Sequence, residues 1–384
     1  LEHASSSAHA PLCLECLWVL TNLTASSSKA CVALVAHPGF EAMMLEHLNP
    51  QTPVLMETAM WILGNLVRDA DAENVYDHVV EKTGILRAMY GCVFPPALET
   101  MSADIARTCA WAVTGLFAGR REDVEYDALE SLKGLFVSSG DETVVREIGH
   151  GLWNWIARWN KKKRRDRYER RHVLAIFGDD GGGIFGGLAI ARTIVSMVKA
   201  PRLAGMGLKL AGYVCSMDTE WAGTLVNKLL LGGLLDALMY VLVWEESANE
   251  KHCNDALWTL SNILAGTEWQ ALRVVGHGIL RLVPAYFAAS APHAREACWC
   301  VTNLVVLRPR DIFHDGLTQL PTAWAMRAAR KHLPSWWHAA LAIAIGDVRA
   351  LDDWSADGLA AAVDEEGRGL ECVAVASGHV PVLQ

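Results

Sequence analysis

A short phrase that returns about every 42 residues constrains the fold more than any other feature of this sequence. In each copy an aromatic residue, usually Trp, is followed four residues later by Asn or a substitute, inside an apolar stretch. Successive tryptophans of the phrase lie 41 to 50 residues apart, except for one gap of 105 residues. The tryptophans are Trp18, Trp61, Trp111, Trp153, Trp258 and Trp299.

The long gap holds one further copy of the phrase. It has Lys209 in the Trp position and Tyr213 in the Asn position, and it divides the gap into 56 and 49 residues. A last, degenerate copy is predicted over residues 340–345. Other apolar segments that open with or near Gly, at 84–90, 230–243 and 276–287, are expected to be the remaining helices of their periods.

A repeat of about 40–47 residues with helical patterning is typical of HEAT and armadillo proteins. We find no run of alternating apolar and polar residues that would predict strands. One such unit cannot bury its apolar face alone, so neighbouring units must stack. The predicted fold is therefore all-α, a right-handed α-solenoid of about eight or nine armadillo repeats that occupies residues 1–384 as one array.

The four-residue spacing places each Trp and its Asn on the same side of a helix, one turn apart. Stacked copies would form a ladder of indoles and amides, and this ladder suits an extended peptide. An Asn amide can both donate to and accept from a peptide backbone, and indole faces attract the stems and charges of Lys and Arg. The competing interpretation is structural, with Trp in the core and Asn capping backbone groups.

In these residues the sequence resembles the importin-alpha family, armadillo adaptors that bind nuclear localisation signals. The resemblance implies a major peptide site at Trp18, Asn22, Trp61, Asn65, Asp69 and Trp111. It implies a minor site at Trp258, Asn262, Trp299 and Asn303, with the acidic residues Asp255 and Glu296. Lys209 and Tyr213 would link the two sites. Asp69, in the phrase from Trp61 to Asp69, corresponds to the family's Asp that binds the critical lysine.

The resemblance also implies partners and a location. The cargoes would be basic signal peptides, and the protein would shuttle between cytoplasm and nucleus. Importin-beta would bind through a segment that, with the first repeat, we expect to precede this chain, since its first residue is Leu; an export receptor is implied as well. The last repeat is expected to be cut short.

Some positions depart from the family pattern. Gly115 stands in the third Asn position of the major site, whereas both minor-site pairs are complete. We therefore expect the minor site to bind at least as well as the major site. Residues 159–172 contain eight Lys or Arg and are predicted to be an inserted solvated loop, with an internal signal mimic or a contact to an acidic partner as alternatives.

Composition and motifs argue against other functions. The net charge of −9 disfavours binding to nucleic acid, so no nucleic-acid partner is expected. No uncharged apolar stretch reaches 18 residues, so no membrane partner is expected either. The glycines of 181–186 match a dinucleotide-binding pattern only superficially, without a following acid at the required distance. Cys13, Cys16, Cys298 and Cys300 have no second pair at zinc spacing, which predicts buried thiols.

We find no nucleophile motif or carboxylate pair, so the protein is expected not to be an enzyme and to need no cofactor or metal. The leading hypothesis is a nuclear import adaptor. The alternative is an armadillo scaffold that binds another extended peptide or partner protein.

Overall fold

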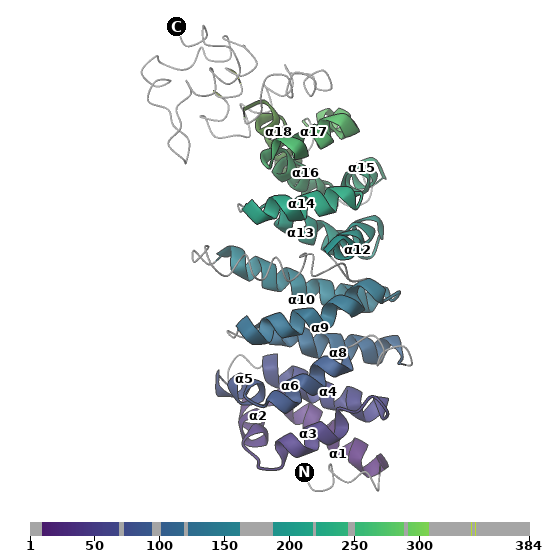
Figure 1. The fold of residues 1–384 in the computed structure, drawn as a ribbon, viewed down its shortest axis with the longest axis vertical. Helices are drawn as coiled ribbons and strands as arrows, with labels where there is room; N and C mark the ends of the chain where they lie inside the picture. Colours follow the sequence, from purple (N-terminus) through teal and green to yellow (C-terminus); the bar gives the residue numbers. More distant parts are fainter. Residues whose placement is uncertain are drawn as a thin grey trace, which may run out of the picture. The chain divides into compact units, whose positions relative to one another are not determined.

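The computed structural model describes residues 10–68, 73–93, 101–118, 122–161, 187–217, 220–244, 250–287 and 291–306, together with residues 339 and 342. These residues divide into an N-terminal unit, up to Thr193, and a C-terminal unit, from Ile194. Within the described ranges all regular structure is helical. The expected all-α solenoid of stacked repeats is confirmed in each unit (Figure 1).

The N-terminal unit consists of stacked rows of helices. The helices that carry the Trp phrase, α1, α4, α8 and α10, pack on one another in that order, and α3, α6 and α9 pack in order beside them, while α2 packs on α5. The bounds are α1 (Ala10–Ser26), α2 (Ser28–Val35), α3 (Phe40–His47), α4 (Pro53–Arg68), α5 (Glu73–Val80), α6 (Thr83–Cys92), α8 (Ala103–Gly115), the 3₁₀ helix η2 (Leu116–Ala118), α9 (Glu122–Ser138) and α10 (Glu142–Lys161).

The C-terminal unit repeats this arrangement. Its phrase-bearing helices α13, α16 and α18 stack in order, while α14 packs on α17 and α15 packs on η3. The bounds are α13 (Ala204–Cys215), α14 (Glu220–Leu231), α15 (Leu234–Trp244), α16 (Glu250–Ala265), α17 (Glu268–His277), the 3₁₀ helix η3 (Ile279–Tyr286) and α18 (Ala291–Val306). Helix α12 (Gly187–Lys199) spans the boundary between the units.

Local sequence explains where several helices begin. Ser27 and Ser102 accept hydrogen bonds from the first turns of α2 and α8. Thr267 and Gln270 form a capping box at the start of α17. The Gln270 amide also donates to the backbone oxygen of Gly223 at 3.0 Å, which ties α17 to α14 of the preceding repeat.

Two predicted helix boundaries were wrong, and glycine explains both. The helix expected over 230–243 is broken after Leu231, because Gly233 adopts φ 95°. The helix expected over 276–287 ends at His277, where Gly278 adopts φ 81° and the tighter 3₁₀ helix η3 follows. Both angles are in the left-handed region that favours glycine. The helix expected over 84–90 is confirmed as α6.

The described helices contain no single segment long and apolar enough to cross a membrane. Two consecutive segments, 223–231 and 234–243, satisfy the length and composition criteria only together, and they meet at an angle of 68°. Both belong to the repeat packing of the C-terminal unit, where Leu229 and Leu234 are buried.

Candidate functional site

The phrase-bearing helices bring the predicted ladder together within each unit. The N-terminal unit stacks Trp18, Trp61, Trp111 and Trp153 on consecutive helices, and the C-terminal unit stacks Lys209, Trp258 and Trp299. We call these seven helices the ladder helices. The repeat predicted from the sequence, including the copy with Lys209 in the Trp position, therefore corresponds to the structural repeat.

Trp18 and Trp61, the first two tryptophans of the N-terminal ladder, have exposed side chains. Their side chains are 48% and 40% exposed, although large aromatic residues usually lie mostly buried. The two rings meet edge to face, with centroids 6.0 Å apart and planes at 85°. An exposed pair of indoles at this separation offers apolar walls to a side chain from another molecule.

Two other indoles rest on the backbone of the preceding ladder helix. A Cβ atom added at Gly64 would lie 2.1 Å from Cζ3 of Trp111, and one at Gly212 would lie 2.4 Å from Cζ3 of Trp258. Gly64 and Gly212 immediately precede the Asn positions of their own repeats. These glycines therefore let each following Trp pack against the helix, so Trp111 and Trp258 join repeats as well as lining the ladder.

The asparagines also join repeats. Asn65 Nδ2 donates to the backbone oxygen of Thr21 and to Oγ1 of Thr24, both at 3.2 Å. Asn303 Nδ2 donates to the backbone oxygen of Ser261 at 2.9 Å. Each acceptor carbonyl belongs to the residue before the preceding repeat's Asn position. The structural interpretation of these two amides is thus supported.

The other two asparagines differ. Asn22 is exposed, and its Nδ2 donates to the backbone oxygen of Trp18 in the same helix at 3.0 Å. Asn262 Nδ2 is buried and has no hydrogen-bond partner among the described residues. A buried amide without a partner costs free energy, so Asn262 gains most from an added acceptor.

Of the two acidic residues assigned to the minor site, Asp255 is half-buried and Glu296 is buried. Burial raises the pKa of Asp255, and the positive charges of Lys251, Lys209 and His252 partly oppose that rise. Burial likewise raises the pKa of Glu296, whose Oε1 lies 3.5 Å from Nε of Arg295. One oxygen of Asp255 is buried with no hydrogen-bond partner within the described structure.

Lys209 and Tyr213 lie among ladder residues of the same unit. The Tyr213 ring meets Trp258 edge to face, with centroids 5.7 Å apart. Because Lys209 lowers the pKa of Asp255, the two charges act on each other. Asp255 thus offsets part of the repulsion that Lys209 would exert on a basic ligand.

Arg68 is a site residue that the sequence reasoning missed. Its guanidinium lies over the Trp111 ring, 4.8 Å from the ring centroid. It donates through Nη2 to the Trp111 backbone oxygen at 2.7 Å and to Thr114 Oγ1 at 2.9 Å. The sequence signal was Gly115, which leaves room for this side chain in the third Asn position.

Several sequence-based predictions lie outside the described residues. These are Asp69, residues 162–172 of the basic segment, the glycines of 181–186 and, apart from residue 342, the degenerate copy at 340–345. The four cysteines singled out above are described: Cys13, Cys298 and Cys300 are buried, and Cys16 is half-buried. Burial raises the pKa of Cys298 to about 12, which keeps that thiol protonated and unreactive at neutral pH.

The stacked helices define an all-α solenoid of the armadillo type. An engineered protein of 14% sequence identity aligns over 99% of this chain and 97% of its own length, with a TM-score of 0.50. A designed armadillo repeat protein in complex with the peptide (KR)4 aligns over 68% of this chain and 97% of its own, with 15% identity and a TM-score of 0.51.

A structure of computationally designed armadillo repeat proteins for modular peptide recognition aligns over 68% of this chain and 98% of its own (14% identity, TM-score 0.50). These similarities establish the fold. No family model matches the sequence, and no curated protein matches it. Membership of the importin-alpha family therefore stays a prediction.

Proposed function

We propose that this protein binds extended basic peptides along its ladder helices, as a nuclear import adaptor. The observation that carries the proposal is the Trp18–Trp61 pair, two indoles exposed side by side on adjacent ladder helices. Indole faces hold the apolar stems of Lys and Arg and attract their charges. A solved designed protein of the same fold is in complex with the basic peptide (KR)4, which supports the choice of ligand.

The C-terminal unit supplies the second element of this proposal. Asp255 and Glu296 lie one turn before Trp258 and Trp299 on the ladder helices α16 and α18. Their raised pKa values show carboxyl groups whose charge is poorly solvated. A cationic side chain from a ligand would relieve that cost.

Under this proposal the cargoes are basic localisation signals, importin-beta is a further partner, and an export receptor returns the protein to the cytoplasm. These partners follow from the importin-alpha resemblance. The second candidate is an armadillo scaffold for another extended peptide, and Arg68 favours it, because a fixed cation on the ladder opposes a uniformly basic ligand.

Peptide titration tests the proposal. One monopartite and one bipartite basic signal peptide, each with a lysine-to-alanine control, would be titrated by fluorescence anisotropy. We expect both parent peptides to bind and the controls to bind at least about tenfold more weakly, a difference of about 1.4 kcal/mol. Equal binding of parents and controls would reject basic-signal recognition and leave the scaffold hypothesis.

A further inference from the structure

The position of Arg68 changes what the middle of the N-terminal ladder can bind. Arg68 is the last residue of α4, and its guanidinium covers the Trp111 ring from the neighbouring ladder helix. Two hydrogen bonds to α8 hold it there, one to the Trp111 backbone oxygen and one to Thr114. The indole that could have received a ligand's cation is therefore occupied by the protein's own.

Gly115 makes this arrangement sterically feasible. A Cβ atom at Gly115 would lie 2.7 Å from Cγ2 of Val67 and 3.2 Å from Nε of Arg68. An Asn at this position would collide with α4 and compete with the guanidinium for the same space. Gly115 thus accounts both for the missing third amide of the ladder and for the position of Arg68 over the Trp111 ring.

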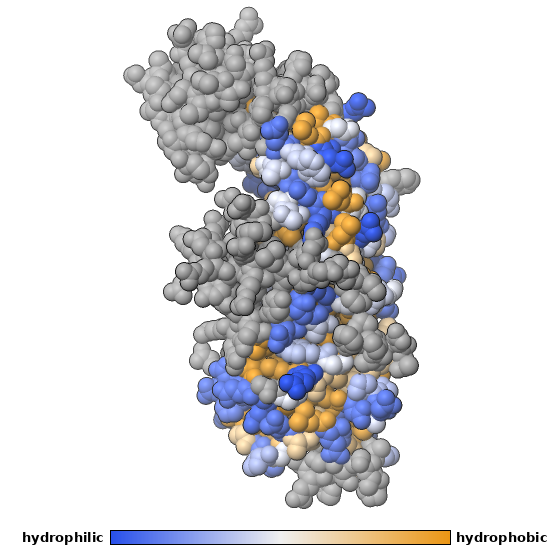
Figure 2. Space-filling view, in the orientation of Figure 1, coloured by the Kyte–Doolittle hydropathy of each residue, from blue (hydrophilic) through white to orange (hydrophobic). Residues whose placement is uncertain are grey.

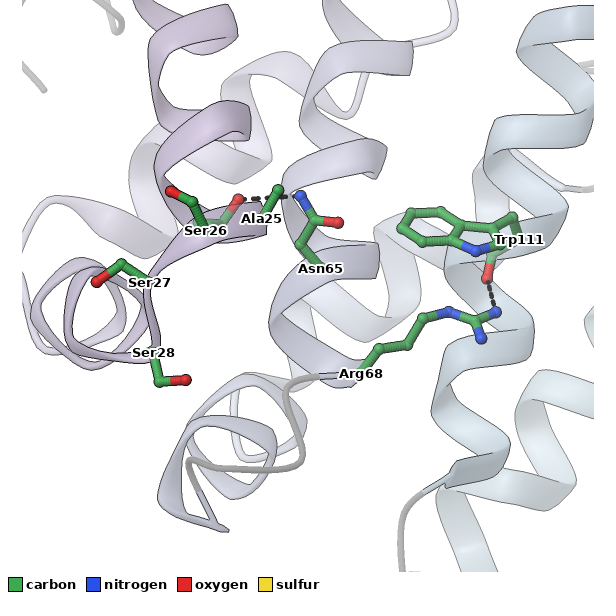
Figure 3. Close-up of a pocket in the computed structure, with 8 residues that line it drawn as sticks. Ala25, Ser26, Ser27, Ser28, Asn65, Arg68 and Trp111 are labelled. Atoms are coloured by element: carbon green, nitrogen blue, oxygen red, sulfur yellow. Dashed lines mark hydrogen bonds between the residues drawn. The ribbon is translucent and has the colours of Figure 1, made fainter.

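A polar cavity of about 350 Å³ adjoins the guanidinium (Figure 3). Its described lining residues include no carboxylate: they are Thr24, Ala25, Ser26, Ser27, Ser28, Asn65, Arg68 and Trp111. Figure 3 shows Asn65 and Arg68 on one side of this space, with the chain from Ser26 to Ser28 opposite. Ser28 begins α2, whose first turn contains no acidic residue.

The chemistry of this cavity is suited to an anion. Among the described residues, both acceptors of Arg68 receive their hydrogen bond from Nη2, so Nε and Nη1 have no acceptor there. A guanidinium with free N–H groups binds a carboxylate through two parallel hydrogen bonds. Burial lowers the pKa of Arg68 while the charge of Glu147 raises it, yet Glu147 forms no ion pair with it. An added carboxylate would stabilise this cation.

We propose that the cavity beside Arg68 is a subsite for an acidic side chain of the bound peptide. The proposal rests on the function proposed above, in which an extended peptide lies along the ladder. The N-terminal ladder then selects a mixed sequence, with basic residues at the Trp18–Trp61 pair and Glu or Asp at the Arg68 cavity. Figure 2 shows hydrophobic and hydrophilic side chains next to one another on the visible face.

A charge-swap scan tests this subsite. The probes are an octapeptide of alternating Lys and Arg, amidated at its C-terminus, and its eight single-Glu variants. Each is titrated against the wild-type chain and, in a Trp258→Ala background, against the chain with Arg68 intact, with Arg68→Gln and with Arg68→Glu. Trp258→Ala serves as the background, so that binding reports on the N-terminal unit. Arg107→Gln is the matched control, since Arg107 lies on the same unit in an exposed ion pair with Asp104.

We expect one of the single-Glu peptides to bind the chain with Arg68 intact at least as tightly as the all-basic parent peptide does. Arg68→Glu should reverse that order and change the affinity ratio of the two peptides by at least about tenfold. Arg107→Gln should leave the ratio unchanged. Gly115→Ala, which adds a methyl group against Arg68 without changing charge, should weaken the preference for the Glu peptide.

The outcomes separate the two proposals. If peptides bind but no Glu position responds to Arg68, the acidic subsite is wrong and the proposed function stands. If no peptide of the series binds the wild-type chain, with its thermal unfolding intact, the proposed function fails and the subsite with it. Arg68→Gln guards against misfolding of the charge-reversed variant, because it keeps a hydrogen-bond donor toward α8.

Discussion

Glu296 is 8% exposed and lies one turn before a ladder indole, so it allows a prediction at the scale of one residue. Burial raises its pKa, so the folded state holds the proton more tightly than the unfolded chain does. Stability is therefore lost as pH rises from the ordinary carboxyl pKa of 4.5 through the raised folded value. Glu296→Gln should raise the melting temperature at pH 7 and change it little at pH 4.

Thermal unfolding at the two pH values, followed by circular dichroism, measures this effect. Glu15→Gln is the control, because Glu15 is exposed on α1. If Glu296 also binds a cationic ligand, the stabilised variant should bind a bipartite basic peptide more weakly. A stability gain with unchanged peptide affinity would remove Glu296 from the minor site while keeping the burial argument.

A second prediction at this scale concerns Asp69, which the importin-alpha resemblance assigns to the critical lysine. A charge-assisted hydrogen bond to a partly buried lysine contributes about 1.5–3 kcal/mol. Asp69→Lys should therefore weaken the binding of a monopartite basic peptide by at least about tenfold. Anisotropy titration measures it, with Asp127→Lys on α9 as the control. An unchanged affinity would remove Asp69 from the site.

At the scale of helices, the glycines under the ladder tryptophans carry a stability prediction. Gly64→Ala would place a methyl group in steric clash with the Trp111 ring, so it should destabilise the N-terminal unit by about 1–3 kcal/mol through overpacking. Gly91→Ala in α6 meets nothing within 4 Å and should be neutral or slightly stabilising, because alanine favours helix. Urea unfolding of both variants measures the difference.

The two ladders also differ in their expected share of peptide binding. The double variant Trp258→Ala/Asn262→Ala should weaken the binding of a monopartite peptide at least as much as the double variant Trp61→Ala/Asn65→Ala does. The reason is that the buried Nδ2 of Asn262 has no hydrogen-bond partner among the described residues, whereas Nδ2 of Asn65 already donates to Thr21 and Thr24. If only the second pair abolishes binding in folded protein, the N-terminal ladder dominates.

The helices and their stacking order followed from periodicity, because each ladder helix carries the same phrase at the same place in its repeat. The residue that reshapes the N-terminal ladder did not follow, because Arg68 reaches Trp111 across 43 positions of sequence. The breaks at Gly233 and Gly278 were also missed, since a glycine signals a positive φ only in its three-dimensional context. The local sequence pattern thus predicted the helices, whereas contacts between repeats determine which side chains line the candidate site.

At the scale of the whole molecule, a solenoid couples each repeat mainly to its neighbours. The N-terminal ladder helices α1, α4, α8 and α10 bury their surfaces against one another, as α13, α16 and α18 do in the C-terminal unit. Stability is then expected to vary along the chain, and a local defect should lower protection near its own repeat. The alternative is one cooperative transition of all described helices.

Hydrogen exchange of Gly64→Ala separates these behaviours. The added methyl group disturbs the contact between α4 and α8, so amide protection should fall in α1, α4 and α8 by about tenfold or more, the equivalent of 1.4 kcal/mol. Protection in α16 and α18 should stay within about twofold of wild type, because their neighbours are unchanged. Gly91→Ala should leave both sets as they are. An equal fall in α4 and α18 would mean that the whole chain opens as one unit, and the repeat-by-repeat account of its stability would be wrong.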